Sequence, residues 1–170
     1  AITAALKLEK PIEALVVGKD VKQISAAASK IEFISKIIVA DGAEYAHNLA
    51  ENIAPLIKQI AKNYSHIFTP ATTFGKNIMP RTAALLDVMQ ISDIIEVISS
   101  DTFKRPIYAG NALATVRSSD PINLITVRST AFEAAEKSGG AAEIINVEGT
   151  GSIGLSEFVS SEQSGSERPE

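Results

Sequence analysis

The apolar positions in the first half of the chain form short continuous runs separated by stretches with helical spacing. The short runs lie at 12–17, 37–39 and 66–69 and are typical of buried strands. In the stretches 21–30 and 46–62, apolar side chains recur every three or four residues, as on one face of a helix. Strands that alternate with helices pair in parallel, because a crossover helix must cover the face of the sheet. This half therefore predicts a mostly parallel α/β sheet.

Two further segments have the composition of helices. Residues 1–8 are rich in Ala and Leu and predict a helix with no strand before it. Residues 74–88 predict another helix, in which Pro80 marks the first turn or a kink.

The pattern changes after Ser92, where short strand-like runs follow one another closely. Gly110-Asn111 and Asp120-Pro121 are turn signals between the last three of the runs at 94–98, 103–109, 113–117 and 124–128. Connections this short join antiparallel neighbours, so we expect a hairpin or meander after the parallel part. A short helix around 131–137 and a strand at 144–147 complete a predicted domain of residues 1–148.

Gly, Ser and Glu dominate residues 149–170, which we interpret as a flexible linker toward a further domain. Gly149–Gly154 matches the G-x-G-x-x-G pattern of dinucleotide-binding proteins. That mechanism needs a helix to begin there, because the amide groups at the helix N-terminus hold the pyrophosphate. The residues that follow are poor helix formers, so the pattern predicts no cofactor site.

Composition excludes several classes of function. The 170 residues contain no Cys, which excludes disulfides, thiolate metal sites and Cys nucleophiles. A net charge of −4 argues against a nucleic-acid partner. No apolar run approaches the roughly 18–20 residues of a membrane span, so we expect a protein that is not membrane-embedded.

Few residues suggest catalysis or metal binding. His47 and His66 are the only histidines, and neither has a second His at metal-ligand spacing. No nucleophile elbow is present. We therefore expect no catalytic residue, no metal site and no enzyme activity.

The segment 69–81 joins a predicted strand to a predicted helix, the position at which open α/β sheets bind ligands. Lys76 and Arg81 could meet an anion there, and Gly75 permits close backbone approach. The alternative is an ordinary helix entry whose cations serve a partner or an internal carboxylate.

Arg105 and Asn111 are the other candidates. Asp101, Phe103, Arg105 and Ile107 alternate and would share one face of a strand. Arg105 then needs a carboxylate, such as that of Asp101, or backbone carbonyls, unless it contacts a partner. Arg117 and Arg128 could add to a basic patch on such a contact. Asn111 follows Gly110 in a turn where positive φ is tolerated, so its role could be purely conformational.

Several of these segments together resemble the alpha subunit of electron transfer flavoprotein. They are Pro70–Asn77 (PATTFGKN), Met79–Arg81 (MPR), Ala83–Val88 (AALLDV), Asp101–Ala112 (DTFKRPIYAGNA), Thr126–Arg128 (TVR) and Thr130–Phe132 (TAF). The resemblance spans essentially the whole chain, in order. It implies a Rossmann-like α/β fold similar to adenine-nucleotide hydrolases, with helices on both faces of the sheet and an antiparallel hairpin.

The resemblance also implies a function that needs more than this chain. The alpha subunit pairs with a beta subunit, and the heterodimer carries electrons from acyl-CoA and related dehydrogenases to a quinone oxidoreductase. FAD is held by a domain that follows a segment like Glu167–Glu170, and AMP belongs to the beta subunit. No cofactor-binding residue is therefore expected in this chain. Lys76, Arg81, Arg105 and Asn111 are instead expected to shape or brace the subunit contact.

Three further expectations accompany the resemblance. Family members begin with a strand before the 1–8 helix, and without it the parallel sheet would have an open slot near its middle. The compartment would be the cytoplasm in a bacterium or the mitochondrial matrix in a eukaryote. The competing hypothesis is a stand-alone adenine-nucleotide-binding α/β domain that uses the turn at 69–81, which rests on fold analogy alone.

Overall fold

Helices and strands alternate through the first half of the protein, as the apolar pattern predicts. The structure is a computed structural model, and it describes residues 1–162. Its helices are α1 (Ile2–Leu6), α2 (Lys22–Ala28), α3 (Ala50–Ala61) and α4 (Thr73–Leu86), with short 3-10 helices η1 (Ala43–Tyr45), η2 (Tyr108–Gly110) and η3 (Ser129–Ala131). Its strands are β1 (Ile12–Gly18), β2 (Ile34–Asp41), β3 (His66–Pro70), β4 (Gln90–Ile94), β5 (Glu96–Val97), β6 (Thr102–Ile107), β7 (Ala112–Arg117), β8 (Asn123–Val127) and β9 (Glu143–Asn146).

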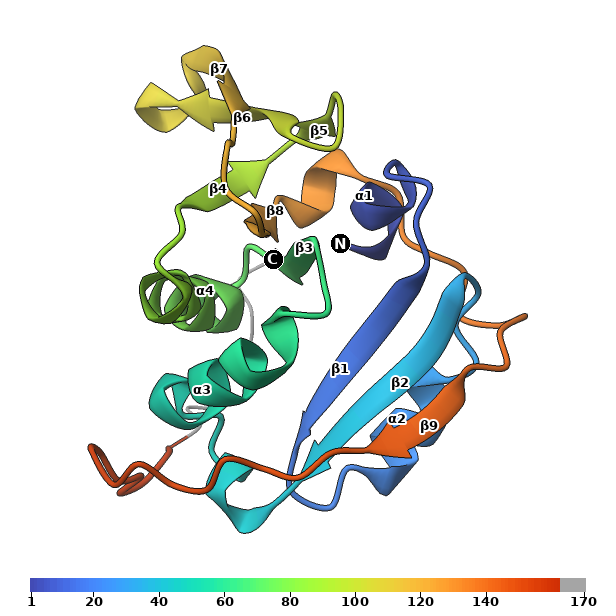
Figure 1. The fold of residues 1–170 in the computed structure, drawn as a ribbon, viewed down its shortest axis with the longest axis vertical. Coiled ribbons are helices and arrows are strands. Elements are labelled where there is room, and N and C mark those ends of the chain that lie inside the picture. The colour runs from blue at the N-terminus through green and yellow to red at the C-terminus, as the bar shows by residue number, and fades with distance from the viewer. Residues whose placement is uncertain (163–170) are drawn as a thin grey trace.

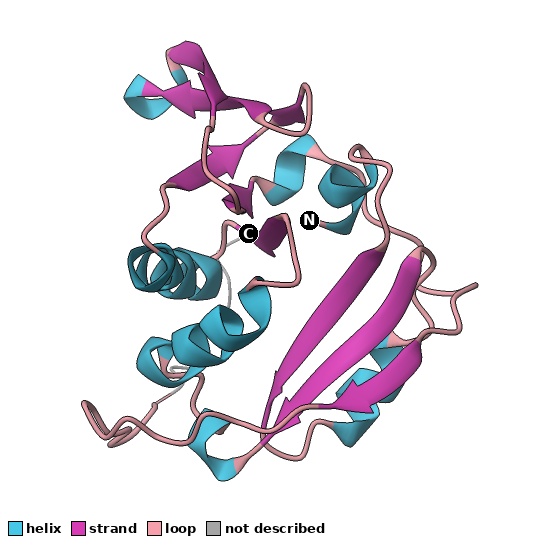
Figure 2. Ribbon diagram, in the orientation of Figure 1, coloured by secondary structure: helices cyan, strands magenta, loops and turns pink. Residues whose placement is uncertain are grey.

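The parallel strands form two sheets instead of one. In the first sheet the order is β1-β2-β9, and in the second it is β3-β8-β4, with every pair parallel. Figure 1 shows the first sheet running diagonally beside α3, and Figure 2 shows the same division by element type. The α/β class with parallel strands is confirmed, and the continuous sheet that we expected is divided.

Helices cover both faces of the strands. In the first sheet, α2 packs on one face through Val21, next to Ile37 and Val39 of β2. The other face contacts α3 through a cluster that includes Ile53 and Leu56. In the second sheet, α4 covers one face, and Ala4 of α1 packs in the cluster on the other. The helices expected on both faces of the sheet are therefore present.

The predicted antiparallel part is only partly correct. β6 pairs with β7 and β5 pairs with β6, all antiparallel, and these strands form a sheet of their own. The run at 124–128 does not continue this meander. It forms β8, which lies between β3 and β4 in the second parallel sheet and is buried along its whole length. Burial at every position is typical of a central strand covered on both faces, and this property outweighs the short connection before it.

Several boundaries also differ from the prediction. The segment 131–137 is not a helix, because η3 ends at Ala131 and no helix follows it before β9. The run at 94–98 is split between the end of β4 and β5. α3 begins at Ala50, four residues later than predicted, after η1. Pro80 lies in the interior of α4, so the helix continues through it instead of beginning there.

The two parallel sheets turn unpaired edges toward each other. β1 and β3 are each the outer strand of their sheet, and within residues 1–162 no ladder joins them. The buried side chains of α3 hold the sheets together, because their cluster also contacts Leu15 and Val17 of β1 and Ile67 of β3. The edges of β1 and β3 thus leave the backbone groups on one side without a sheet partner.

Candidate functional site

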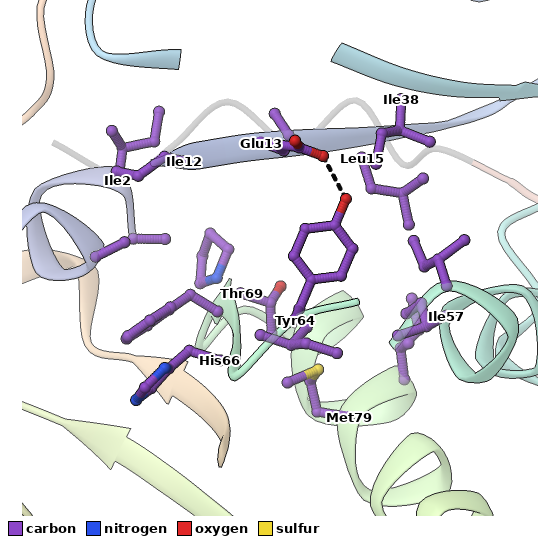
Figure 3. Close-up of a pocket in the computed structure, with 18 of the residues that line it drawn as sticks. Ile2, Ile12, Glu13, Leu15, Ile38, Ile57, Tyr64, His66, Thr69 and Met79 are labelled. Atoms are coloured by element: carbon purple, nitrogen blue, oxygen red, sulfur yellow. Dashed lines mark hydrogen bonds between the residues drawn. The ribbon is translucent and has the colours of Figure 1, made fainter. Parts of the chain in front are cut away.

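A cavity of about 720 Å³ lies between β1 and β3. Its walls are mostly aliphatic and aromatic side chains from the two strands and from α1, α3 and α4. Figure 3 shows Ile12 and Leu15 on β1, with Ile57 and Met79 across the space from that strand. The cavity exists because each sheet ends there, so its walls include strand edges as well as side chains.

One polar contact crosses this cavity. The Tyr64 hydroxyl, which follows α3, donates a hydrogen bond to the carboxylate of Glu13 on β1 (Figure 3). Lys36 on β2 donates to the other oxygen of the same carboxylate at 2.9 Å. Burial raises the pKa of Glu13, but the hydrogen bonds from Tyr64 and Lys36 outweigh it and leave the pKa lowered. Glu13 is therefore an ionised group held by two donors.

His66 stands at the rim, at the start of β3. One ring nitrogen lies 2.6 Å from the Ser100 carbonyl oxygen, and the other lies 2.9 Å from the Ser65 hydroxyl. Only an N–H can donate to a carbonyl, so the neutral ring carries its proton on Nε2. Burial lowers the pKa of His66 and favours this neutral form. His66 is therefore a partly buried polar group at the start of β3.

The residues of the cavity do not suit a flavin dinucleotide. A pyrophosphate needs cations or backbone amides that converge on it. Here the walls are apolar, and the ionised Glu13 would repel an anion. Lys10 lines the cavity, but its ammonium group donates to the Ser65 hydroxyl at 3.1 Å. We therefore assign no cofactor to this space.

The β5–β6–β7 sheet projects from the parallel sheets (Figure 1). Phe103 of β6 is fully buried in the core of the second sheet. Nearby, the Asp101 carboxylate accepts hydrogen bonds from Thr102, Ser99 and Arg117, and these hold the pKa of Asp101 well below its usual range. The sheet is thus anchored at its base.

The far end of this sheet presents apolar side chains to solvent. Tyr108 at its tip is 80% exposed and Leu113 on β7 is 60% exposed. Tyr108 and Ala109 both have positive φ, which is uncommon for residues with a side chain. β7 pairs only with β6, so its other edge is unpaired within the described residues. An anchored base and an exposed apolar tip are features of a contact surface.

The structure places the four predicted contact residues in two separate regions, helix α4 and the β5–β6–β7 sheet with its tip. Lys76 and Arg81 lie on α4 and are exposed. Arg105 lies on β6 and Asn111 ends η2 at the tip of the β5–β6–β7 sheet. None of the four lines the cavity between β1 and β3.

The structure corrects the prediction for Asn111 and decides between the two partners considered for Arg105. Asn111 has an ordinary φ of −70°, and the positive φ values fall on the three residues before it, Tyr108, Ala109 and Gly110. Its backbone N–H donates to Tyr108 at 3.1 Å, which closes the turn. Arg105 does not pair with Asp101. Its Nε donates to the Ser92 carbonyl oxygen at 2.7 Å, the second of the partners that we considered.

Arg117 and Arg128 do not form a common basic patch. They end strands that lie in different sheets, and each has its own carboxylate. Arg117 pairs with Asp101 at 2.7 Å, and Arg128 binds the carboxylate of Asp93.

Helix capping and close packing explain the residues of the turn at 69–81. Thr72 caps α4, and its side-chain oxygen accepts from the Gly75 N–H at 3.3 Å. A Cβ on Gly75 would overlap with the carbonyl oxygen of Pro70 at the end of β3. The glycine thus lets the first turn of the helix approach the strand, which favours an ordinary helix entry over an anion site.

Sequence reasoning missed the cluster formed by Glu13, Tyr64 and Lys36. These residues are far apart in the chain, and no motif links them. The one available signal was a charged residue inside the apolar run 12–17, since a carboxylate on a central strand needs partners.

The described residues hold no group of three or more His, Asp or Glu side chains arranged to bind a metal ion. Among the same residues, no helix has the length and apolar character required to cross a bilayer.

An α/β domain of parallel strands with a projecting antiparallel sheet is the class that this architecture defines. Comparison with known proteins makes the assignment specific. Residues 1–150 match the family described as "Electron transfer flavoprotein domain", and the chain belongs to that family.

Three relatives illustrate the similarity. The chain is 54% identical over 169 residues to "Electron transfer flavoprotein subunit alpha" of Pseudomonas aeruginosa, which covers 99% of this chain and 55% of the relative. It is 45% identical over 167 residues to the protein of that name from Paracoccus denitrificans, covering 98% and 54%. The relative from Dictyostelium discoideum, named as mitochondrial, is 45% identical over 153 residues, covering 85% and 43%. The chain spans about half the length of the curated relatives it matches.

Proposed function

We propose that residues 1–148 are the N-terminal scaffold and subunit-contact domain of an electron transfer flavoprotein alpha subunit. One observation carries this proposal: similarity to alpha subunits runs along 99% of this chain but along only 55% of the Pseudomonas aeruginosa relative. The apolar walls and the ionised Glu13 of the cavity support the same division, since they do not suit FAD.

In this proposal the chain is part of an electron carrier and not an enzyme. A heterodimer of alpha and beta subunits would hold FAD outside residues 1–170 and AMP in the beta subunit. It would take electrons from acyl-CoA and related dehydrogenases and deliver them to a quinone oxidoreductase. Its compartment would be the cytoplasm of a bacterium or the mitochondrial matrix of a eukaryote. The segment 163–170, with the Glu167–Glu170 motif of the predicted linker, lies outside the described residues.

We assign the contact with the beta subunit to the β5–β6–β7 sheet and the exposed face of α4. The sheet offers Tyr108 and Leu113, both largely exposed, and an unpaired edge on β7. Lys76 and Arg81 on α4 would supply charge at the rim of the contact, which steers association more than it adds affinity. Arg105 would brace the sheet through its hydrogen bond to Ser92, and Asn111 would brace the turn at the tip.

Charge reversal separates these roles. Arg81→Glu should weaken binding of the beta subunit by about tenfold, the loss of roughly one favourable rim pair and its replacement by repulsion. The melting temperature should hardly change, because Arg81 is exposed. Lys58→Glu, which reverses an exposed cation on α3, is the matched control and should bind normally. Equal affinities for the wild type, R81E and K58E would contradict the assignment of α4.

Arg105→Glu should behave differently, because it removes the hydrogen bond to the Ser92 carbonyl oxygen in a half-buried position. We expect a lower melting temperature as well as weaker binding. Thermal melts beside the binding assay check this, and unchanged stability would contradict the bracing role.

We also propose that an extended strand from outside residues 1–170 fills the cavity between β1 and β3. Both facing edges are unpaired, and the walls are apolar as around a central parallel strand. Such a strand would join the two parallel sheets into one and would displace the Tyr64 side chain that now crosses the space.

A further inference from the structure

The residues that follow β9 run along η1 and the beginning of α3 (Figure 1). The backbone N–H of Val147 donates to the Val39 carbonyl oxygen at 2.8 Å, which extends the pairing with β2 by one residue. Val147 also packs against the core cluster that contains Tyr45. The chain therefore leaves β9 already in contact with η1.

Two buried polar side chains bind this segment. Tyr45 is 1% exposed, and its hydroxyl oxygen accepts a hydrogen bond from the Thr150 N–H at 3.0 Å. Asn52 is 3% exposed, and its Oδ1 accepts from the Ile153 N–H at 3.1 Å. The Asn52 amide nitrogen donates to the Glu44 carbonyl oxygen at 2.9 Å, which fixes its orientation. Each of these side chains therefore uses a buried oxygen atom to hold a backbone N–H of the segment.

The remaining contacts continue the attachment toward the C-terminal side. The ring of Phe158 stacks on His47 with centroids 3.9 Å apart and an interplanar angle of 7°. The Ser156 hydroxyl donates to the carboxylate of Glu51 in the first turn of α3. At the other end, a Cβ on Gly149 would lie 2.6 Å from a Glu44 carboxylate oxygen and 3.0 Å from the Tyr45 hydroxyl oxygen, so the backbone passes close to both side chains.

We propose that Gly149–Phe158 is a fixed strap, held by Tyr45, Asn52 and His47, which sets the place where the following polypeptide leaves the domain. The free part of the linker then begins after Phe158 and not at Gly149. The strap is defined by contacts of this chain alone. Its consequence for a following domain rests on the proposed function.

The strap shortens the tether, by which we mean the free part of the linker between this domain and whatever follows it. Each extended residue adds at most about 3.5 Å of reach, so release of the ten strap residues would lengthen the tether by up to about 35 Å. A longer tether lowers the effective concentration of whatever it carries near this domain. The strap thus restricts the positions open to a flavin-holding domain attached beyond it.

The first test removes one backbone hydrogen-bond donor of the strap and changes none of the buried side chains that hold it. Ile153→Pro deletes the N–H that binds Asn52 and leaves the buried side chains intact. In hydrogen exchange on the 170-residue chain, we expect the wild-type Thr150 and Ile153 amides to be protected about tenfold or more over their intrinsic rates. In I153P, Thr150 should lose this protection, and chymotrypsin should cut at Leu155 and Phe158 about tenfold faster.

Val159→Pro is the matched control, since Val159 is largely exposed and lies just beyond the strap. It should leave exchange at Thr150 and the cleavage rate at Leu155 unchanged. The strap is refuted if the wild-type Thr150 and Ile153 amides exchange at intrinsic rates, or if I153P and V159P are cut equally fast at Leu155.

If I153P destabilises the whole domain, a second variant still tests the strap. Phe158→Ala removes the ring that stacks on His47, so the His47 ring protons should lose their ring-current shift in NMR spectra. Identical His47 shifts in wild type and F158A would also refute the strap. None of these measurements needs the beta subunit, so failure of the strap and failure of the proposed function are distinguishable.

Discussion

Glu13 stays ionised at the wall of an apolar cavity because Tyr64 and Lys36 both donate to it. Tyr64→Phe removes one donor and should lower the free energy of unfolding by about 1 kcal/mol near neutral pH, since the site is only partly buried. Urea unfolding measures this loss. The dependence of the unfolding free energy on pH gives a second measurement.

The pKa of Glu13 is lower in the folded protein than its ordinary 4.5, so its contribution to stability is present above that value and is lost as pH falls through the folded pKa. Y64F should show a smaller loss of stability over this acid range than the wild type. Identical acid profiles would mean that Tyr64 does not hold the carboxylate.

His66 predicts a second dependence on pH with a different cause. Burial lowers the pKa of its ring below the ordinary 6.5, so the unfolded chain takes up a proton first as pH falls. Stability should therefore decline from about pH 6.5 down to the folded pKa and level off below it. The stability of His66→Gln should decline less steeply than that of the wild type between about pH 7 and about pH 5. Both proteins contain His47, so the difference between them reports on His66. A wild type that gains stability on acidification would contradict this account.

At the residue scale, the sequence indicates which kind of partner a buried charged group needs but does not identify that partner. For Arg105, the sequence left open a carboxylate, such as that of Asp101, or backbone carbonyls. In the structure its Nε donates to the Ser92 carbonyl oxygen. Its partner could not be decided because Asp101 pairs with Arg117 across β6 and β7, and that pairing depends on strand register. Glu13 and Tyr64 meet only through the tertiary fold, so no local pattern could reveal them.

At the scale of elements, the junction of β3 and α4 depends on Gly75. In an open helix, Gly→Ala stabilises by about 0.5–1 kcal/mol. At Gly75 the sign should reverse, because the new methyl group would overlap with the Pro70 carbonyl oxygen. We expect Gly75→Ala to lower the free energy of unfolding by more than about 2 kcal/mol. Asn77→Ala, an exposed position of the same helix, is the control, and a stabilised G75A would contradict the close packing.

The elements themselves were predictable where the apolar pattern was long and regular. α3, α4, β1 and β2 lie within a few residues of their predicted positions. β8 was assigned to the wrong sheet because a five-residue connection usually joins antiparallel neighbours. Its uninterrupted burial, from Asn123 to Val127, is the property that places it among parallel strands.

At the scale of the whole molecule, the division of the parallel strands should be visible in hydrogen exchange. β2 and β8 have a partner on both sides, so their amides should exchange slowest. β1 and β3 should exchange like the outer strands β4 and β9, because each has a partner on one side only. If β1 and β3 were as protected as β2 and β8, the two sheets would be joined and the cavity closed.

We propose that this chain is a support and that the flavin is held by polypeptide outside residues 1–170. The most direct test is to incubate the purified chain with excess FAD, desalt it and record the visible absorbance spectrum. The account predicts a colourless protein with no flavin bound, and calorimetric titration with AMP should likewise show no micromolar binding. A yellow protein that keeps its flavin through desalting would contradict the central claim.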